Sequence, residues 1–262
     1  MSALTEARSS SAFDLPRRFG GLDRLFGPQQ AHRIRSAHVT VVGIGGVGSW
    51  SVEALARSGV GRLTLIDLDH VSESNINRQL HALTSTLGQA KVEAMQDRIA
   101  LIHPECFVTP VDEFITPENV HELLPQSTDV LIDATDQVKA KVAMASWALA
   151  HHKPMIMVGA AGGKKHAQQV ELADLAHTSH DPLLAHVRQQ LRKAGIAPSH
   201  PSPMGIHAVF SKEPITHPST VTGEEGAQCA PDLHCHGYGS LVTVTATFGQ
   251  CAAGWALNQL ST

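Results

Sequence analysis

The chain has 262 residues, of which 42% are hydrophobic, and a formal net charge of −4. This length is enough for one α/β domain with a large core. The acidic balance excludes a surface devoted to duplex DNA, and the 4% aromatic content argues against stacking platforms for single strands, so contact with nucleic acid requires a local basic patch. The four cysteines form no C-x-x-C pair and no signal peptide is visible, which predicts reduced thiols and a cytoplasmic location.

The first half of the chain begins with a segment, residues 1–14, that is rich in Ser and Ala and is expected to be disordered. Residues 17–35 mix basic and apolar side chains and predict short helices. Residues 39–48 read VTVVGIGGVG, an apolar run that leads into the glycines Gly43, Gly45, Gly46 and Gly48. This pattern predicts a buried parallel strand, a tight turn and a helix over 47–57.

The glycine-rich turn is typical of nucleotide-binding units. The free N–H groups and the positive dipole end of the following helix point at an anion, which predicts binding of a nucleotide phosphate. An ordinary structural turn is the alternative, because G-x-G-x-x-G occurs in such turns as well.

Strands and helices alternate through the rest of this half. Strands are predicted at 62–67, 107–111, 129–133 and 154–158, and helices at 90–102, 117–124 and 138–150. This alternation predicts an α/β fold, a Rossmann-like, doubly wound and mainly parallel sheet.

The second half has a different pattern. It predicts a strand at 168–172, a helix at 182–193 with a basic end, a strand at 205–211, a long loop at 217–239 and a helix at 241–260. We expect an antiparallel extension of the sheet in this half, with substrate-side loops and an insertion over 176–240. Residues 1–262 are interpreted as a single domain.

The C-terminal segment from Leu233 to Thr262 contains no Asp, Glu, Lys or Arg. Its length is sufficient to span a bilayer, but several Thr residues interrupt it and no basic flank follows. We therefore expect a helix buried in the core or at a subunit interface, and this expectation favours a homodimer over a membrane protein.

Asp67 lies at the end of the second predicted strand, where a Rossmann unit uses an acid to bind ribose hydroxyls of NAD or ATP. The segment that follows is too polar and too long for a simple turn. Arg78 can fork onto phosphate oxygens, and Asn75 and Gln79 can donate to them. Cations beside a triphosphate serve an adenylating enzyme, in which charge builds on the α-phosphate and on departing pyrophosphate, rather than a dehydrogenase.

Two further charged residues complete the predicted site. Lys91 opens a helix, where the dipole disfavours a cation unless an anion offsets it. Asp136 follows the strand that ends at Asp133, and its carboxylate suits Mg²⁺; the alternative is that Asp136 only caps the helix starting at Val138. Arg78, Lys91 and Asp136 are the predicted catalytic residues, with ATP and Mg²⁺ as cofactors.

Four motifs together resemble the ubiquitin-activating-type adenylation superfamily: GIGGVGS, IDLDHVSESNINRQ, GQAKVEAM and IDATD. The resemblance implies that Asp67 binds ribose, that Asn75, Arg78 and Lys91 bind phosphates, and that Asp136 binds magnesium. It also implies that an arginine of a partner subunit reaches the triphosphate. The usual R-Y-x-R-Q start is replaced here by RFGG, so Arg18 or Arg24 would supply that arginine.

Further segments, among them RFGGLDRLFG, HPECFVTPVDEFITPENV, LADLAHTSHDPL and GYGSLVTVTATFG, resemble the bacterial tRNA threonylcarbamoyladenosine dehydratases within this superfamily. That resemblance implies ATP-dependent dehydration and cyclisation of the threonylcarbamoyl side chain on adenosine 37 of tRNA, through an acyl-adenylate. Contact with tRNA is expected from the basic residues Lys164, Lys165, Arg188, Arg192 and Lys193.

Three other functions remain open from the sequence. Adenylation of the C-terminus of a ubiquitin-like sulfur carrier is disfavoured because the usual pair of zinc-binding C-x-x-C motifs is missing, although a cysteine desulfurase or sulfur-acceptor partner is conceivable. An NAD-dependent oxidoreductase and a non-catalytic RNA-binding module are disfavoured by the phosphate-handling residues. Cys235 is either a thioester nucleophile or an incidental cysteine.

Overall fold

The computed structural model describes residues 14–199, 201–216 and 238–262. The disorder expected for residues 1–13 and most of the predicted loop 217–239 lie outside the described residues. So does Cys235, about whose role the structure says nothing.

One seven-stranded sheet, in the order β3-β2-β1-β4-β5-β7-β6, forms the centre of the described chain. Its strands are β1 (His38–Val42), β2 (Arg62–Ile66), β3 (Phe107–Val111), β4 (Val130–Asp133), β5 (Met155–Val158), β6 (Val170–Asp174) and β7 (His207–Ser211). All neighbouring pairs are parallel except β6 and β7, which are antiparallel. The predicted α/β fold with an antiparallel C-terminal extension is therefore confirmed.

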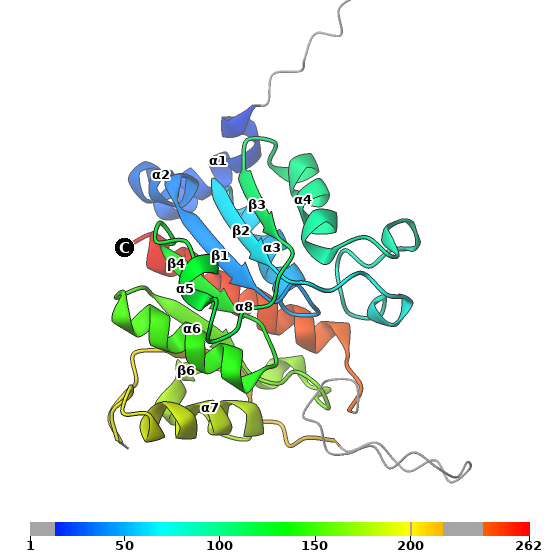
Figure 1. The fold of residues 1–262 in the computed structure, drawn as a ribbon. Coiled ribbons are helices and arrows are strands. Elements are labelled where there is room, and N and C mark those ends of the chain that lie inside the picture. Colours follow the sequence, from blue (N-terminus) through cyan, green and yellow to red (C-terminus); the bar gives the residue numbers. More distant parts are fainter. Residues whose placement is uncertain (1–13, 200, 217–237) are drawn as a thin grey trace, which may run out of the picture.

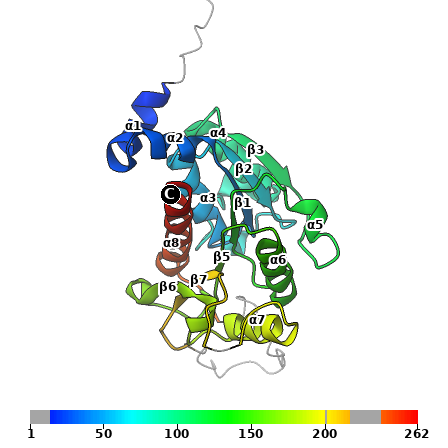
Figure 2. The ribbon, with the colours of Figure 1, turned by 90° about the vertical axis from the view of Figure 1, so that its left-hand side faces the viewer.

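Helices cover both faces of the sheet (Figures 1 and 2). They are α1 (Leu15–Phe26), α2 (Pro28–Ser36), α3 (Gly48–Arg57), α4 (Lys91–Ile102), α5 (Val120–Leu123), α6 (Val138–Ala150), α7 (Pro182–Lys193) and α8 (Val242–Leu260). Figure 2 shows α8 on one side of the sheet and α6 and α7 on the other. The predicted helix at 182–193 is confirmed, and Asp181 caps it by accepting a hydrogen bond from the N–H of Leu184.

The alternation of side chains along each strand divides the apolar core into two layers. Val39 and Val41 of β1 face the layer that contains α3 and α8, whereas Val42 faces the layer that contains α6 and α7. Successive side chains of a strand point to opposite faces, so a strand covered on both faces needs apolar residues throughout. This explains why the central strands β1 and β4 are buried along their whole length.

Several details differ from the sequence prediction. Helix α5 begins at Val120, not at 117, because the Asn119 side chain accepts from the N–H of Thr116 and donates to the carbonyl of Phe114, which holds these residues in a loop. Strand β6 begins at Val170, two residues later than predicted. Strand β7 lies between β5 and β6 and is parallel to β5, a long-range pairing that no local pattern indicates.

Helix α8 packs inside the molecule. Val244, Phe248 and Ala252 are completely buried, and the helix contacts α3 as well as the central strands. The apolar segment thus finds its cover within one chain. The predicted helix buried in the core is therefore confirmed, and the homodimer stays a prediction. Among the described residues, no helix is long and apolar enough to cross a membrane.

Candidate active site

A cavity of about 320 Å³ opens at the carboxyl ends of the central strands, where ligands bind in open α/β sheets. Predicted site residues that line it are Gly43, Gly45, Gly46, Asp67, Arg78, Gln79, Lys91 and Asp136. The fold thus brings together most of the predicted set from five separate segments. Gly48 and Asn75 are the two predicted residues that do not line the cavity.

The four glycines of the turn between β1 and α3 have different structural tasks. Gly43 has a φ of +86°, and a Cβ there would lie 2.8 Å from the backbone of Ala134. A Cβ on Gly48 would lie 1.8 Å from the carbonyl oxygen of Gly43, so this glycine lets the helix start against the strand. Gly45 and Gly46 face the cavity, which leaves their backbone accessible to a phosphate.

Asp67 lies at the end of β2 and is tied to the same turn. Its Oδ2 accepts from the N–H of Ile44 at 2.5 Å, and its Oδ1 accepts from the N–H of Asp69 at 2.8 Å. Burial raises the pKa of the Asp67 carboxyl, and the nearby charge of Lys91 and these two hydrogen bonds oppose the rise. The carboxylate therefore positions the glycine-rich turn while lining the cavity where a ribose would bind.

Lys91 has its counter-ion in this chain. It opens α4, its side chain is only 6% exposed, and its Nζ donates to Asp69 Oδ2 at 2.7 Å. The anion that the sequence demanded near the helix start is therefore Asp69, whose own side chain is 55% exposed. This arrangement holds a buried ammonium beside the cavity.

Arg78, Gln79 and Asn75 come from the segment after β2. The Arg78 aliphatic stem covers Gly46, and its Nη1 donates to the Ser74 carbonyl and to Asn77 Oδ1, both at 2.8 Å. Gln79 is buried, and its Oε1 has no hydrogen-bond partner among the described residues. Asn75 is buried too, but its Oδ1 accepts from the N–H of Ser72, so the structure gives it a turn-forming contact away from the cavity.

Asp136 lines the cavity in the loop between β4 and α6. The N-cap position of α6 belongs to Gln137, whose side chain makes no capping hydrogen bond.

A second acid of the same motif forms an ion pair that the sequence reading missed. Asp133 Oδ2 and Lys141 Nζ lie 3.1 Å apart with both side chains fully buried, and Lys141 also donates to the carbonyl of Val158 at 2.7 Å. The available signal was a lysine within an otherwise apolar helix that follows a strand ending in an acid.

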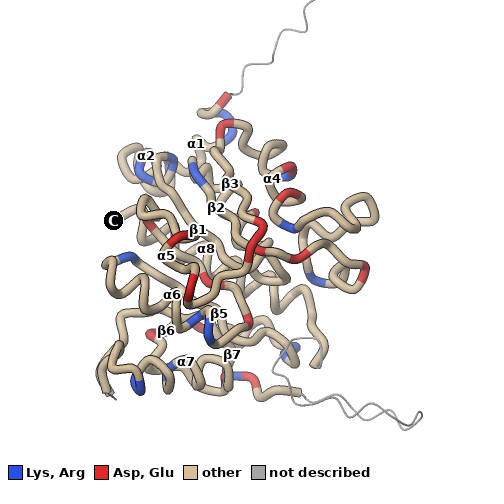
Figure 3. The backbone as a smooth tube through the Cα atoms, in the orientation of Figure 1, with Lys and Arg blue, Asp and Glu red and all other residues tan. Residues whose placement is uncertain are grey.

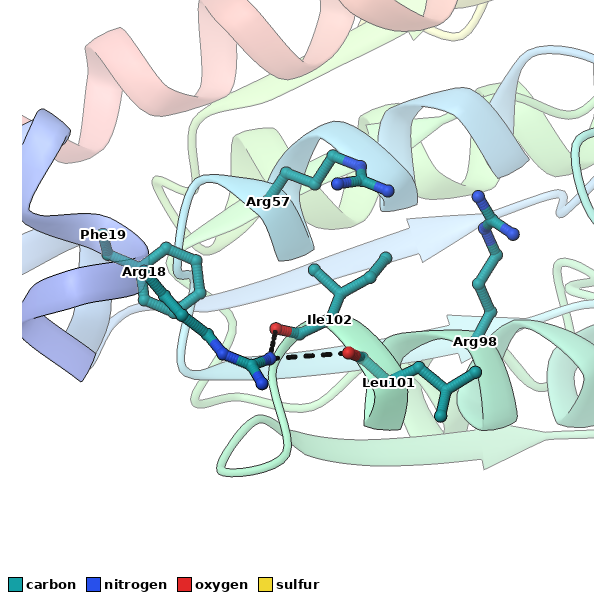
Figure 4. A pocket seen from close by; sticks show the side chains of 6 residues that line it. All are labelled: Arg18, Phe19, Arg57, Arg98, Leu101 and Ile102. Carbon is teal, nitrogen blue, oxygen red and sulfur yellow. Dashed lines mark hydrogen bonds between the residues drawn. The ribbon is translucent and has the colours of Figure 1, made fainter. Parts of the chain in front are cut away.

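Neither candidate for the trans-acting arginine lines the cavity of its own chain. Arg18 lies beside Arg57 and Arg98 in a separate pocket, shown in Figure 4, where it donates to the carbonyls of Leu101 and Ile102 at the end of α4. Arg57 is the last residue of α3, whose first turn lies at the cavity, and a helix of ten residues is about 15 Å long. The Arg18 pocket is therefore at the opposite end of the sheet.

The predicted basic patch for tRNA is smaller than expected. Lys164 is 2% exposed and donates to the carbonyls of His180 and Glu213, so it cannot belong to a surface patch. Arg188 donates to the Thr178 carbonyl at 3.1 Å and to the Leu175 carbonyl at 3.3 Å. Lys165 and Lys193 are exposed, and Figure 3 shows basic residues along α7. Lys164 is therefore not part of the exposed basic patch, because its side chain points inward and donates to two carbonyls.

Two cysteines lie within the described residues, and both are free. Burial raises the pKa of the Cys106 thiol to about 12 and also raises that of Cys251. Both thiols are therefore protonated near neutral pH and unsuited to nucleophilic catalysis.

The fold and this cavity define a class: a Rossmann-like nucleotide-binding protein with cations and carboxylates gathered around a glycine-rich phosphate turn. The chain belongs to the ThiF family, whose model matches residues 21–262. It is 44% identical to the tRNA threonylcarbamoyladenosine dehydratase of Haemophilus influenzae and 41% identical to that of Escherichia coli, covering 93% of each chain in both comparisons. The solved structure of the Escherichia coli enzyme with ATP superposes with a TM-score of 0.84, at 41% identity and covering 94% of both chains.

Proposed function

We propose that this chain is an ATP-dependent adenylating enzyme that dehydrates and cyclises the threonylcarbamoyl side chain of adenosine 37 in tRNA. The observation that carries the proposal is the cavity itself, which gathers the glycine turn, Asp67, Arg78, Lys91 and Asp136 in a fold shared with an ATP-bound dehydratase. The similarity extends over nearly the full length of the dehydratases from two bacteria.

The chemistry matches such a site. A carboxylate oxygen of the side chain attacks the α-phosphorus of ATP, and the bond to pyrophosphate breaks. An internal nucleophile of the same side chain then attacks the acyl carbon, the acyl–oxygen bond breaks, and AMP leaves with the former carboxylate oxygen. The nucleophile loses its proton, so the side chain loses the elements of water. Adenylation is needed because a carboxylate cannot expel an oxide near neutral pH.

The lining residues divide these tasks. The N–H groups at the start of α3 and the Arg78 and Lys91 cations would hold the phosphates, and Asp67 would hold the ribose. Asn75 supports this segment from beneath and is not proposed as a direct ligand, in view of its contact with Ser72. The amide oxygen of Gln79 has no hydrogen-bond partner among the described residues, and its amide nitrogen lies 3.9 Å from the position that a Cβ on Gly45 would take, so Gln79 is suited to a polar contact with the nucleotide.

Magnesium is part of the proposal, with Asp136 as its protein ligand. Mg²⁺ is usually held by one or two carboxylates together with substrate phosphates. The described residues contain no cluster of three or more His, Cys, Asp or Glu side chains that could hold a metal ion. Bound there, magnesium would neutralise charge on the phosphates.

A homodimer in the cytoplasm also belongs to the proposal. Its support is the superfamily resemblance, in which a partner arginine reaches the triphosphate, since neither Arg18 nor Arg24 lines the cavity of its own chain. Light scattering at micromolar concentration tests the dimer, and a monomer mass with full activity would contradict it.

One experiment tests the reaction. Incubation with ATP, Mg²⁺ and tRNA that carries threonylcarbamoyladenosine should yield the cyclised nucleoside by mass spectrometry, together with AMP and pyrophosphate. Unmodified tRNA should remain unchanged, and NAD should have no effect. Formation of ADP, or activity only with a ubiquitin-like sulfur carrier, would overturn the proposal; the second outcome would also revive a sulfur-transfer partner.

A further inference from the structure

One wall of the cavity is made of backbone and small side chains. Residues 158–162, which follow β5, all line it. Within the described part of the chain, the N–H groups of Ala161 and Gly162 have no hydrogen-bond partner, although both residues are buried. Buried N–H groups without a partner are rare in folded proteins and call for a ligand or a water.

The N–H groups of the residues next to this pair are satisfied. Gly159 donates to the carbonyl of Val209 at 2.8 Å, Ala160 donates to Asp181 Oδ2 at 2.8 Å, and Gly163 donates to the carbonyl of Gly239 at 3.0 Å. The two unpartnered groups are therefore consecutive and are flanked on both sides by anchored residues.

Buried charged side chains from separate elements hold this wall. Asp181 at the start of α7 packs so closely that a Cβ on Gly159 would lie 2.0 Å from its Oδ2. Lys141 of α6 donates to the carbonyl of Val158 at 2.7 Å. The Glu213 carboxylate accepts from the N–H groups of Lys165 at 2.9 Å and of His166 at 2.8 Å. These hydrogen bonds restrain the backbone on both sides of Ala161 and Gly162, so the two N–H groups have little freedom to reorient.

We infer that the N–H groups of Ala161 and Gly162 form an oxyanion-binding pair for the acyl group of the substrate, and that Asp181 is its positioning residue. This inference rests on the proposed function. Backbone donors aimed at developing negative charge stabilise it strongly when they are held in place beforehand. The acyl oxygen carries such charge during the attack on the α-phosphorus and again when the ring closes.

The position of the pair favours the acyl group over a phosphate. The start of α3 and the cations Arg78 and Lys91 already serve the triphosphate, on the β1 and β2 side of the cavity. Ala161 and Gly162 follow β5, on the far side of β4 from that turn. Departing pyrophosphate is the other oxyanion that could reach the pair, so the experiment must separate the two.

The test replaces each amide by an ester, using lactic acid at position 161 and glycolic acid at position 162 in cell-free synthesis. This removes one N–H and keeps the side chain. Each ester should lower kcat with threonylcarbamoyladenosine-containing tRNA by roughly 10²-fold, the scale of losing one oxyanion donor. The KM for ATP should stay within about twofold of that of the native chain made in the same system.

Asp181→Ala, which leaves the donors intact but unanchored, should lower kcat by at least about tenfold with the KM for ATP unchanged. Asp174→Ala is the matched control. Asp174 accepts from three backbone N–H groups, those of Ala176, Met204 and Gly205, but none of these three residues lines the cavity, whereas Ala160, which donates to Asp181, does. Its loss should change melting temperature and not kcat. Asp181→Asn, which keeps one acceptor, should recover part of the lost turnover.

Two results would overturn the inference. Unchanged kcat in both ester proteins would remove the pair from catalysis, and a raised KM for ATP with unchanged kcat at saturating ATP would assign the donors to the triphosphate. The native chain serves as the separate test of the proposed function. If it forms cyclised nucleoside while the esters match it, only the oxyanion pair is lost; if it forms none, the proposed function itself fails.

Discussion

At the scale of single residues, the buried ion pair of Asp133 and Lys141 is important for the stability of the fold. Both side chains are fully buried, and the ammonium is shared between the carboxylate and the carbonyl of Val158. Removing one partner from such a pair leaves an uncompensated charge in the core. The pair therefore joins β4, α6 and β5 directly beneath the cavity.

Lys141→Met should destabilise the fold by about 3–5 kcal/mol, measured by urea unfolding, because Asp133 then stays buried without its counter-charge. Lys139→Met is the matched control in the same helix. Lys139 is exposed, so its loss should change the free energy of unfolding by less than about 0.5 kcal/mol. Equal effects of the two variants would show that the buried pair contributes nothing specific.

His81 should make the fold sensitive to acid. It is 2% exposed, neither ring nitrogen has a hydrogen-bond partner among the described residues, and burial lowers its pKa to about 4. At a pH between the folded pKa of His81, about 4, and its unfolded pKa, near 6.5, the imidazole binds a proton only in the unfolded chain. The free energy of unfolding is therefore not reduced by His81 above pH 6.5. It falls as the pH drops below that value, by about 2 kcal/mol at pH 5.

His81→Leu should reduce that loss. The measurement is the free energy of unfolding in urea at pH 7 and pH 5, compared with the native chain. The exposed His186 provides a control, since His186→Gln should leave the pH dependence unchanged. A His81→Leu protein with the native pH dependence would show that other groups dominate acid sensitivity.

Lys91→Ala and Asp136→Asn should each lower turnover by ~10²-fold or more, the scale of losing one preorganised electrostatic contact. Binding of tRNA should barely change, because neither residue lies in the basic segment. Their combined loss should be less than additive, since both serve one adenylation step. Melting temperature measured beside turnover separates chemistry from stability. A destabilised but fully active Asp136→Asn protein would exclude magnesium binding at this residue.

At the scale of elements, the contact between α8 and α3 links the C-terminal helix to the phosphate turn. A Cβ on Gly249 would lie 2.5 Å from the carbonyl oxygen of Val47, the residue just before α3. Ser51 of α3 also donates to the carbonyl of Gly249 at 3.0 Å. The helix therefore supports the turn from behind, although it contributes only Thr245 to the lining of the cavity.

Gly249→Ala should destabilise the protein by about 1–3 kcal/mol and raise the KM for ATP, because the added methyl would clash with the carbonyl of Val47, the last residue of the turn before α3. Gly254→Ala in the same helix is the opposite case. Nothing lies within 4 Å of the added Cβ, so this change should stabilise by about 0.5–1 kcal/mol through helix propensity. Thermal unfolding compares them, and stabilisation by both would refute the close contact.

At the scale of the whole molecule, tRNA must find a basic surface on a chain with a net charge of −4. Neutralising Lys165 and Lys193, which are exposed, should weaken tRNA binding and reduce its dependence on salt. Lys164→Gln should instead lower stability, because this ammonium is buried against two carbonyls. Filter binding over a salt series measures tRNA affinity and its salt dependence, and thermal unfolding measures the stability of the Lys164→Gln protein. If the double variant keeps the native affinity and salt slope, tRNA binds elsewhere.

The sequence by itself determined the alternating strands and helices, the glycine turn after β1 and the acid at the end of β2. These features depend on local periodicity and on residues close together in the chain, so propensity and pattern are enough to find them. The superfamily motifs indicated the residues proposed to bind phosphate in the same way. Eight of the ten predicted binding residues line one cavity because parallel strands end at one edge of the sheet.

Only the tertiary structure decided which charges are buried and which donors lack a partner. The sequence predicts Lys164 to be a surface cation, but in the fold it donates to the carbonyl of Glu213, 49 residues further along the chain. The position of Asp181 before a helix indicates a helix cap, but in the fold its second oxygen also accepts from the N–H of Ala160, 21 residues earlier. Strand β7 joins β5 across a similar gap. Such contacts depend on how whole helices and strands pack together, so short-range sequence patterns do not predict them.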